Sequence, residues 1–383
     1  MKQPGAAIVL GEHDGRGRED VFADGALAVR SRKGVRPCER ALLHALPKER
    51  AGSALVVNSV EGLAGMALRA LSPQLCVYCH FDDAWDLETA QATAGRHRGI
   101  APDMGIAPDL PEGPWDLVLL PFERNGVVEL LRERLRFALA HLKPGGLLFT
   151  STDNPRDRFL REEVLELFGS ATTQREPSGR GGVAYIARRP QKPKLREKPT
   201  ERAFTVREGE SVLSFVSRPG VFCHGRLDAG TRVLLSCMYV GQARRIADLG
   251  CGVGVIGLIA ALRGPEARVT LVDSSARSVQ CAQRNIASLG LAGRCETLLT
   301  ADPLRDLEGG YDLVLSNPPY YGNYRIADLF LKTAAKVLIP GGRLALVTKG
   351  AEWYTAAMKQ LFANVAPREQ HGYWVLTSVK GVQ

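Results

Sequence analysis

The stretch YDLVLSNPPYY occupies residues 311–321, and the related stretch WDLVLLPFERN occupies residues 115–125. Each begins with an aromatic residue and an aspartate and continues as an apolar segment typical of a buried strand. A second pair, LAHLKPGGLLFTS at residues 139–151 and AKVLIPGGRLALV at residues 335–347, repeats the same spacing of 196 residues. The chain therefore contains an internal duplication.

A third pair extends the duplication upstream in each copy. Residues 55–71 read LVVNSVEGLAGMALRAL and align with residues 246–262, IADLGCGVGVIGLIAAL, at an offset near 190. Each copy reads as a strand, a glycine-containing turn, a helix and a second strand. Strands that alternate with helices predict parallel sheets built from βαβ units. We therefore expect an α/β protein with two Rossmann-like domains in tandem.

A proline-rich segment separates the two copies. Residues 187–202 read ARRPQKPKLREKPTER and show no apolar periodicity. Residues 188–202 carry seven basic side chains against two acidic ones, which is typical of a solvated linker and is compatible with phosphate contacts. We predict a first domain at residues 1–188, a basic linker at 189–202 and a second domain at 203–383.

The composition is that of an ordinary globular protein, with 45% hydrophobic and 24% charged residues among 383. The formal charge of +9 fits either a polyanionic partner or simple solubility. No apolar run approaches the ~20 residues that cross a bilayer, and we find no signal peptide, so we expect a cytoplasmic protein without membrane association. Only Cys76 and Cys79 form a CxxC pair, whereas a zinc site needs about four ligands, so we predict a buried strand there and no metal site.

Acidic and glycine residues follow three successive strands of the second copy. Glycines at a strand-to-helix turn let the backbone approach a ligand, and an acidic residue there suits an ammonium group. A carboxylate after the second strand can accept hydrogen bonds from ribose hydroxyls, and one after the third can hold an adenine amino group. Each acid alone could be a helix cap or turn residue, but together they predict an S-adenosylmethionine pocket. The residues assigned to it are Asp248, Gly250, Cys251, Gly252, Gly254, Asp273, Ser274 and Asp302.

The motif Asn317-Pro318-Pro319-Tyr320 follows the strand at residues 311–316 and supplies the predicted catalytic residues. The amide oxygen of Asn317 and a proline carbonyl can accept hydrogen bonds from one amino group, which is otherwise a poor nucleophile. The ring of Tyr320 offers a stacking face for a planar substrate. We therefore predict direct methyl transfer to a planar nitrogen, with Asn317 also beside the cofactor.

The first copy lacks these groups. At an offset near 190, the turn keeps only Gly62, and the strand at residues 75–79 ends near Cys79 where an acid is expected. We infer a degenerate domain for substrate docking or structural support. The substituting residues are Asn58 for Asp248, Val60 for Gly250, Ala64 for Gly254, and Pro121, Phe122, Glu123 and Arg124 for the Asn-Pro-Pro-Tyr motif.

The tandem arrangement and the sequence PGVFCHGRLDAGTRVLL at residues 219–235 resemble the RsmC/RlmG-type bacterial ribosomal RNA guanine-N2 methyltransferases. The resemblance implies two class I methyltransferase domains with mostly parallel seven-stranded sheets. It implies N2-methylguanosine formation in ribosomal RNA, for which we favour the small subunit. We separately expect a monomer. It also implies that Asp228 helps to frame the site and that Phe222, Gly230 and Thr231 contact the cofactor. The family commonly has Phe-His where this chain has Tyr320-Tyr321, a change that keeps a stacking face.

The residues alone leave other substrates open, because the Asn-Pro-Pro-Tyr motif also suits adenine N6 or a glutamine amide of a protein. The degenerate first copy and the basic linker disfavour the glutamine alternative. A non-catalytic RNA-binding assembly factor is a further alternative, which the joint presence of Asp248, Asp273 and Asn317 disfavours.

Overall fold

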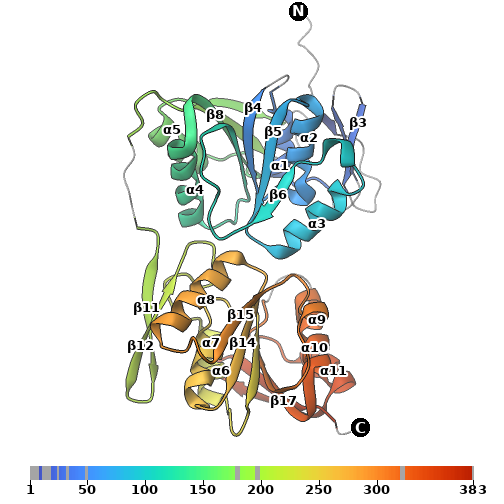
Figure 1. Ribbon diagram of the computed structural model, residues 1–383, viewed down its shortest axis with the longest axis vertical. Coiled ribbons are helices and arrows are strands. Elements are labelled where there is room, and N and C mark those ends of the chain that lie inside the picture. The colour runs from blue at the N-terminus through green and yellow to red at the C-terminus, as the bar shows by residue number, and fades with distance from the viewer. Residues whose placement is uncertain are drawn as a thin grey trace, which may run out of the picture. The chain divides into compact units, whose positions relative to one another are not determined.

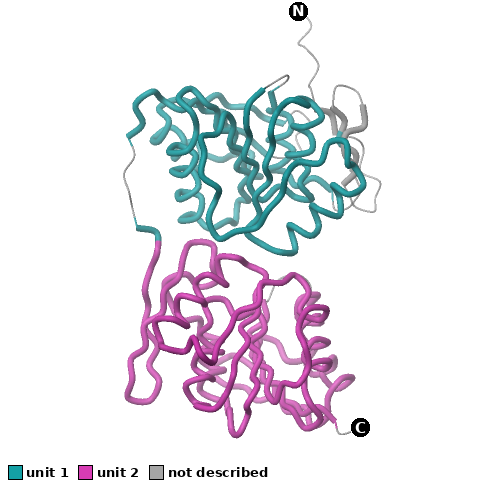
Figure 2. The backbone as a smooth tube through the Cα atoms, in the orientation of Figure 1, with its two compact units in different colours: residues 1–200 teal, residues 201–383 magenta. Residues whose placement is uncertain are grey.

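Each sequence copy forms a seven-stranded sheet in the computed structural model of this chain (Figure 1). The chain divides into two units, residues 1–200 and 201–383, so the division lies inside the segment predicted as a linker (Figure 2). The structure describes residues 8–10, 19–23, 26–31, 34–47, 51–176, 182–194, 199–319 and 324–381.

The sheet of the first unit has the order β6-β5-β4-β7-β8-β10-β9. The first five strands are parallel, and β10 runs antiparallel to both of its neighbours. The strands are β4 (Gly52–Val57), β5 (Leu75–Phe81), β6 (Asp103–Ile106), β7 (Trp115–Phe122), β8 (Leu142–Thr152), β9 (Thr172–Arg175) and β10 (Val183–Arg188). The helices are α1 (Pro37–His44), α2 (Leu63–Leu71), α3 (Ala84–Ala94), α4 (Val128–His141) and α5 (Phe159–Phe168), with 3-10 turns η1 (Val60–Gly62) and η2 (Arg98–Ile100). A small antiparallel sheet precedes them, with β1 (Ile8–Leu10), β2 (Glu19–Ala23) and β3 (Ala26–Ser31).

The sheet of the second unit repeats this topology with the order β15-β14-β13-β16-β17-β19-β18, in which only β19 is antiparallel to its neighbours. A two-stranded hairpin, β11 (Arg202–Glu208) and β12 (Ser211–Ser217), precedes it. The strands are β13 (Arg245–Leu249), β14 (Arg268–Asp273), β15 (Cys295–Leu299), β16 (Tyr311–Ser316), β17 (Leu338–Thr348), β18 (Ala363–Gln370) and β19 (Tyr373–Val379). The helices are α6 (Ala229–Cys237), α7 (Val255–Arg263), α8 (Ala276–Ser288), α9 (Pro303–Asp306), α10 (Arg325–Val337) and α11 (Glu352–Leu361).

The second sheet is covered on both faces, with α6, α7 and α8 on one side and α9, α10 and α11 on the other (Figure 1). Successive residues of β13 alternate between the two cores, since Ile246 packs on the first side and Ala247 on the second. A parallel strand that is buried on both faces reads as a continuous apolar run, which is why this strand was recognisable in the sequence. The predicted fold class, two tandem Rossmann-like α/β domains with mostly parallel seven-stranded sheets, is confirmed.

The ladder between strands corrects the alignment of the two copies. Leu117 of β7 pairs with Ala54, and Leu313 of β16 pairs with Ile246. Since Leu117 and Leu313 are equivalent, Ala54 is equivalent to Ile246, and the offset in this region is 192 instead of about 190. The offset near 190 was wrong, because it aligned Gly62 with Gly252, whereas the strand register aligns Gly62 with Gly254.

The corrected offset changes which residue stands where at the turn. Gly62 is equivalent to Gly254, and both have positive φ directly before a helix, at 70° and 90°. Asn58, with φ at 50°, stands for Gly250. Strand β5 also continues past Cys79 to Phe81, so a buried phenylalanine occupies the place of Asp273. By the same register, Val56 replaces Asp248 and Val60 replaces Gly252.

Replacing Gly254 by Ala is expected to destabilise the second unit by about 2–3 kcal/mol, because the side chain adds a clash to a left-handed backbone. An added Cβ would lie 2.8 Å from Leu271 Cδ2. Gly209→Ala is the matched control, since its φ is +58° and nothing lies near its added Cβ. That control is expected to lose only about 1 kcal/mol. Thermal unfolding of both variants measures the difference, and equal losses would contradict a packing role for Gly254.

Candidate active site

The carboxyl ends of β13, β14 and β16 bring the predicted site residues together. Leu249, the last residue of β13, lies opposite Ser316, the last residue of β16. The Ser316 hydroxyl donates a hydrogen bond of 2.8 Å to the Leu249 carbonyl. Gly250 and Asn317 therefore begin neighbouring loops at one edge of the sheet, as the sequence predicted.

The glycine-rich turn is tied to the end of β14 by its own backbone. The amides of Gly250 and Cys251 donate to the Val272 carbonyl at 2.8 and 3.0 Å. The amide of Gly252 donates to Asp273 Oδ2 at 2.8 Å. The turn is therefore held in place by protein groups alone, and Asp273 helps to shape it.

The three glycines of the turn serve different purposes. A Cβ on Gly250 would lie 3.0 Å from the Phe330 ring, and a Cβ on Gly254 would collide with Leu271. A Cβ on Gly252 would meet nothing within 4 Å. Gly250 and Gly254 are thus required by packing, whereas Gly252 faces open space that a ligand could occupy.

Asp248 is fully buried and faces α7 from β13. Its Oδ2 accepts a hydrogen bond of 2.8 Å from the Gly257 amide, so it anchors the first turns of that helix. Its Oδ1 has no hydrogen-bond partner in the described part of the chain. Burial raises the pKa of Asp248 to about 7, and the negative charge of Asp273 adds to the increase, because both oppose ionisation of the carboxyl group.

The acids after β14 and β15 hold local backbone. Asp273 Oδ1 accepts from the Ser275 amide at 2.9 Å, while half-buried Ser274 lies between these two residues. Asp302 is the N-cap of α9, and its Oδ1 accepts from the Arg305 amide at 3.1 Å. The alternative of a helix cap, which the sequence left open for each acid, thus describes the contact that Asp302 makes.

Asn317 is held by the start of α6. Its Nδ2 donates to Asp228 Oδ2 at 2.8 Å and to Thr231 Oγ1 at 3.0 Å. Asp228 Oδ2 also accepts from the Thr231 amide at 2.8 Å as the N-cap of this helix. Because these two oxygens both accept from the amide nitrogen, they fix the orientation of the Asn317 amide, with its nitrogen toward the start of α6.

The remaining predicted residues follow Asn317 in the sequence or belong to α6 and the segment before it. Pro318 is buried and Pro319 half-buried, while Tyr320 lies outside the described residues. Gly230 is buried in α6, and Phe222 is 59% exposed in the segment before that helix. Thr231 was predicted to contact the cofactor, and the structure places its hydroxyl on Asn317.

An aromatic stack that the sequence analysis did not assign to the site follows β16 and β17. The rings of Tyr324 and Trp353 are 4.4 Å apart and nearly parallel at 12°, and Tyr354 meets both rings edge-on. Tyr324 is 45% exposed. The signal available in the sequence was the position of these aromatic residues in the segments that follow two predicted strands.

The described residues contain neither a candidate metal site nor a candidate membrane-spanning helix. No three His, Cys, Asp or Glu side chains among them are grouped so that they could hold a metal ion. None of their helices combines the length and the apolar character needed to cross a membrane. Cys76 and Cys79 lie on β5, the first exposed and the second buried, in agreement with the predicted strand.

Comparison with known proteins identifies relatives of both units. Residues 212–377 match the family model described as "Methyltransferase small domain". The chain is 33% identical to the ribosomal RNA large subunit methyltransferase G of Pseudomonas putida over 66% of this chain and 68% of that protein. It is 30% identical to the protein of the same name from Pseudomonas syringae pv. tomato, covering 81% and 83%. The ribosomal RNA small subunit methyltransferase C of Pseudomonas aeruginosa is 31% identical over 62% and 70%.

The solved structure of the Thermus thermophilus protein described as "16S rRNA N2 G1207 methyltransferase (RsmC) in complex with AdoMet and Guanosine" has the same fold. Its TM-score is 0.74 at 22% identity, and the match covers 98% of this chain and 99% of that chain. Both units and their order are therefore shared with that protein. The chain belongs to the methyltransferase family formed by the ribosomal RNA small subunit methyltransferases C and large subunit methyltransferases G.

Proposed function

We propose that this protein transfers a methyl group from S-adenosylmethionine to the exocyclic N2 amino group of a guanine in ribosomal RNA. The observation that carries this proposal is the fixed amide of Asn317 beside the glycine-rich turn. The relatives support it, since their names describe ribosomal RNA methyltransferases and one is described with AdoMet and guanosine bound.

The residues at the turn fit S-adenosylmethionine, which supplies an electrophilic methyl group on its sulfonium. The open space beside Gly252 leaves room for the cofactor to approach the backbone of the turn. Asp273 accepts the amides of Gly252 and Ser275 at this edge of the sheet, and we assign its carboxylate as the acceptor for the ribose hydroxyls. Asp248 is fully buried, and its Oδ1 has no partner among the described residues, so it supplies negative charge behind the turn that suits a cationic donor. We assign Ser274 and Asp302 to the adenosine end, and Phe222 and Gly230 to the rim.

Asn317 and the prolines orient the reacting nitrogen. An exocyclic amino group on a base has a delocalised lone pair, so positioning has to compensate for weak nucleophilicity. We assign the Asn317 oxygen and the Pro318 carbonyl as acceptors for its two hydrogens, and Pro319 as the residue that stiffens the loop. Tyr320 is assigned to stack on the base.

The Asn317 oxygen and the Pro318 carbonyl together form the proposed amino-group clamp. The identity of the base and of the ribosomal subunit depends on contacts beyond this clamp. Two acceptors recognise any amino group, so adenine N6 and a glutamine amide satisfy the same geometry. Relatives named for the small and the large subunit match this chain at similar identity. We propose small-subunit RNA, following the resemblance, and treat the other substrates as outcomes of the assay.

The first unit is proposed to dock the substrate or support the second unit. Its turn carries Val56, Val60 and Phe81 where the second unit has Asp248, Gly252 and Asp273, which removes both acids and the open glycine. We propose one cofactor site per chain, a linker role for residues 189–202, and a cytoplasmic monomer.

The direct test is methyl transfer from labelled S-adenosylmethionine to unmodified ribosomal RNA and to isolated subunits, followed by digestion to nucleosides and mass spectrometry. N2-methylguanosine is the expected product. N6-methyladenosine would support the proposed clamp but identify adenine as the target base. Label on protein would indicate a glutamine side chain as the substrate. Cofactor binding without transfer to any of these substrates would favour the assembly-factor alternative and overturn the proposal.

Replacing Asn317 by Ala should lower turnover by at least about a hundredfold, because both positioning and an acceptor are lost, while cofactor affinity stays near wild type. Single-turnover rates and calorimetric binding of S-adenosylmethionine separate the two effects. Unchanged turnover would contradict the amino-group clamp.

The clamp's support can be tested without removing Asn317. Asp228→Ser keeps a good helix N-cap but is too short to reach Asn317, and Thr231→Val removes the other acceptor at constant volume. Each should reduce kcat about tenfold, or roughly 1.4 kcal/mol, with little change in KM for RNA or in melting temperature. A variant that loses only stability, with kcat intact, would assign these residues to the fold alone.

Asp273→Ala should weaken binding of S-adenosylmethionine by about 1–3 kcal/mol, since ribose hydroxyls lose their acceptor. Asp312→Ala is a matched control, because Asp312 also accepts two backbone amides, from Arg244 and Arg245, each at 2.8 Å. Asp312 lies at the start of β16, away from the turn. Equal cofactor affinity in both variants, measured by calorimetry, would exclude the ribose role.

A further inference from the structure

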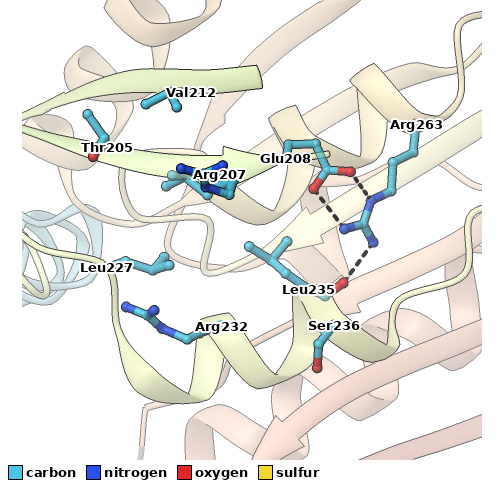
Figure 3. Close-up of a pocket in the computed structure, with 10 residues that line it drawn as sticks. Thr205, Arg207, Glu208, Val212, Leu227, Arg232, Leu235, Ser236 and Arg263 are labelled. Carbon is cyan, nitrogen blue, oxygen red and sulfur yellow. Dashed lines mark hydrogen bonds and ion pairs between the residues drawn. The ribbon is translucent and has the colours of Figure 1, made fainter. Parts of the chain in front are cut away.

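A groove of about 410 Å³ lies between the β11–β12 hairpin and α6, the helix whose first turn holds Asn317. Figure 3 shows β11, with Thr205 and Arg207, on one side of the groove and α6, with Arg232 and Leu235, on the other. No step of the proposed methyl transfer uses this groove. Its walls belong entirely to the second unit.

The far end of the groove is closed by one internal ion pair. Arg263 Nε and Nη2 donate to the two carboxylate oxygens of Glu208 at 2.7 and 2.8 Å. Arg263 Nη1 also donates to the carbonyl of Leu235 at 2.7 Å, at the end of α6 (Figure 3). These bonds hold the pKa of Glu208 below its usual value, so the single acid that lines the groove is ionised and already neutralised.

Two further arginines leave the groove with a positive charge. Arg207 and Arg232 are both exposed, and neither has a carboxylate partner in the described ranges. With Glu208 and Arg263 cancelling each other, the lining carries a net charge of +2 from these two side chains. A guanidinium group donates in a fixed fork that matches phosphate oxygens, which makes a phosphate the complementary ligand.

The near end of the groove reaches the residues that hold Asn317. Leu227 lines the groove and directly precedes Asp228, and Arg232 directly follows Thr231 on the first turn of α6. The same helical turn therefore carries the clamp for the reacting amino group and one of the two unpaired arginines. A nucleotide held at Asn317 would place its neighbours' phosphates near this end.

We propose that this groove binds backbone phosphates of the substrate RNA next to the target nucleotide, with Arg207 and Arg232 as the phosphate ligands. The inference rests on the proposed function and adds a second contact region to it. Contacts of this kind fix the register of a nucleic acid without reading its sequence, and they weaken as salt displaces them.

The test is the double variant Arg207→Gln/Arg232→Gln in the full chain. Its control is Lys359→Gln/Arg368→Gln, which removes the same charge from exposed side chains on α11 and β18. With unmodified ribosomal RNA as the varied substrate, the groove variant should raise KM about tenfold or more. Its kcat at saturating RNA and its affinity for S-adenosylmethionine should stay within about twofold of wild type, since neither arginine touches the clamp.

Salt dependence supplies a second readout. Binding of a fluorescein-labelled 20-nucleotide single-stranded RNA should give a log–log salt slope that is shallower by about 1.4 in the groove variant, or about 0.7 per arginine. The control variant should keep the wild-type slope. An unchanged KM and slope in the groove variant, or equal changes in both variants, would overturn the inference. Failure of the wild-type protein to methylate any RNA would instead overturn the proposed function, so the two failures are distinguishable.

Discussion

The parallel ladder between β13 and β16 is the constraint on which the site depends. It ends with Leu249 opposite Ser316, and the Ser316 hydroxyl closes it with a bond to the Leu249 carbonyl. Strands β13 and β16 end opposite each other, so the glycine-rich turn and Asn317 have to begin side by side. The contact of the Gly252 amide with Asp273 and that of the Asn317 amide with Asp228 both lie in the loops that begin there.

The first unit keeps the equivalent ladder between its strands but has different side chains at the turn that follows it. Asn58, at the position of Gly250, exchanges two hydrogen bonds of 3.0 Å with Asp82. Asp82 in turn pairs with buried Arg134, which stands at the position of Phe330. In the second unit the Phe330 ring packs closely over Gly250. A polar network thus fills the region that an aromatic ring and a bare backbone share in the second unit, and the sheet tolerates both solutions because its strands are unchanged.

The sequence predicted the strands, helices and duplication because parallel strands buried on both faces give long apolar runs. It also indicated the turn, Asp273 and the Asn-Pro-Pro-Tyr motif at one edge. It did not predict that Asp228 and Thr231 hold Asn317, since the contact joins residues 86 to 89 positions apart through side-chain rotamers. Nor did it show that Asp248 faces α7, because a strand pattern that is apolar on both faces does not say to which side a single acid points. The two-residue error in aligning the copies has the same origin, as only the ladder defines equivalence.

The proposed site separates orientation of the reacting nitrogen from selection of the substrate. In the proposed clamp the Asn317 oxygen accepts from the substrate in one orientation, and an amino group on guanine, adenine or an amide would satisfy it equally. Selection would then come from groups that touch the rest of the substrate, for which we propose the α6 turn, the exposed Phe222 and the arginine-lined groove. Phosphate contacts position a nucleic acid while base contacts specify it. In the proposed mechanism, the clamp is indifferent to the base and shares one helical turn with the proposed contact for the RNA backbone. The choice of substrate would then depend on which nucleotide the RNA structure can deliver to Asn317.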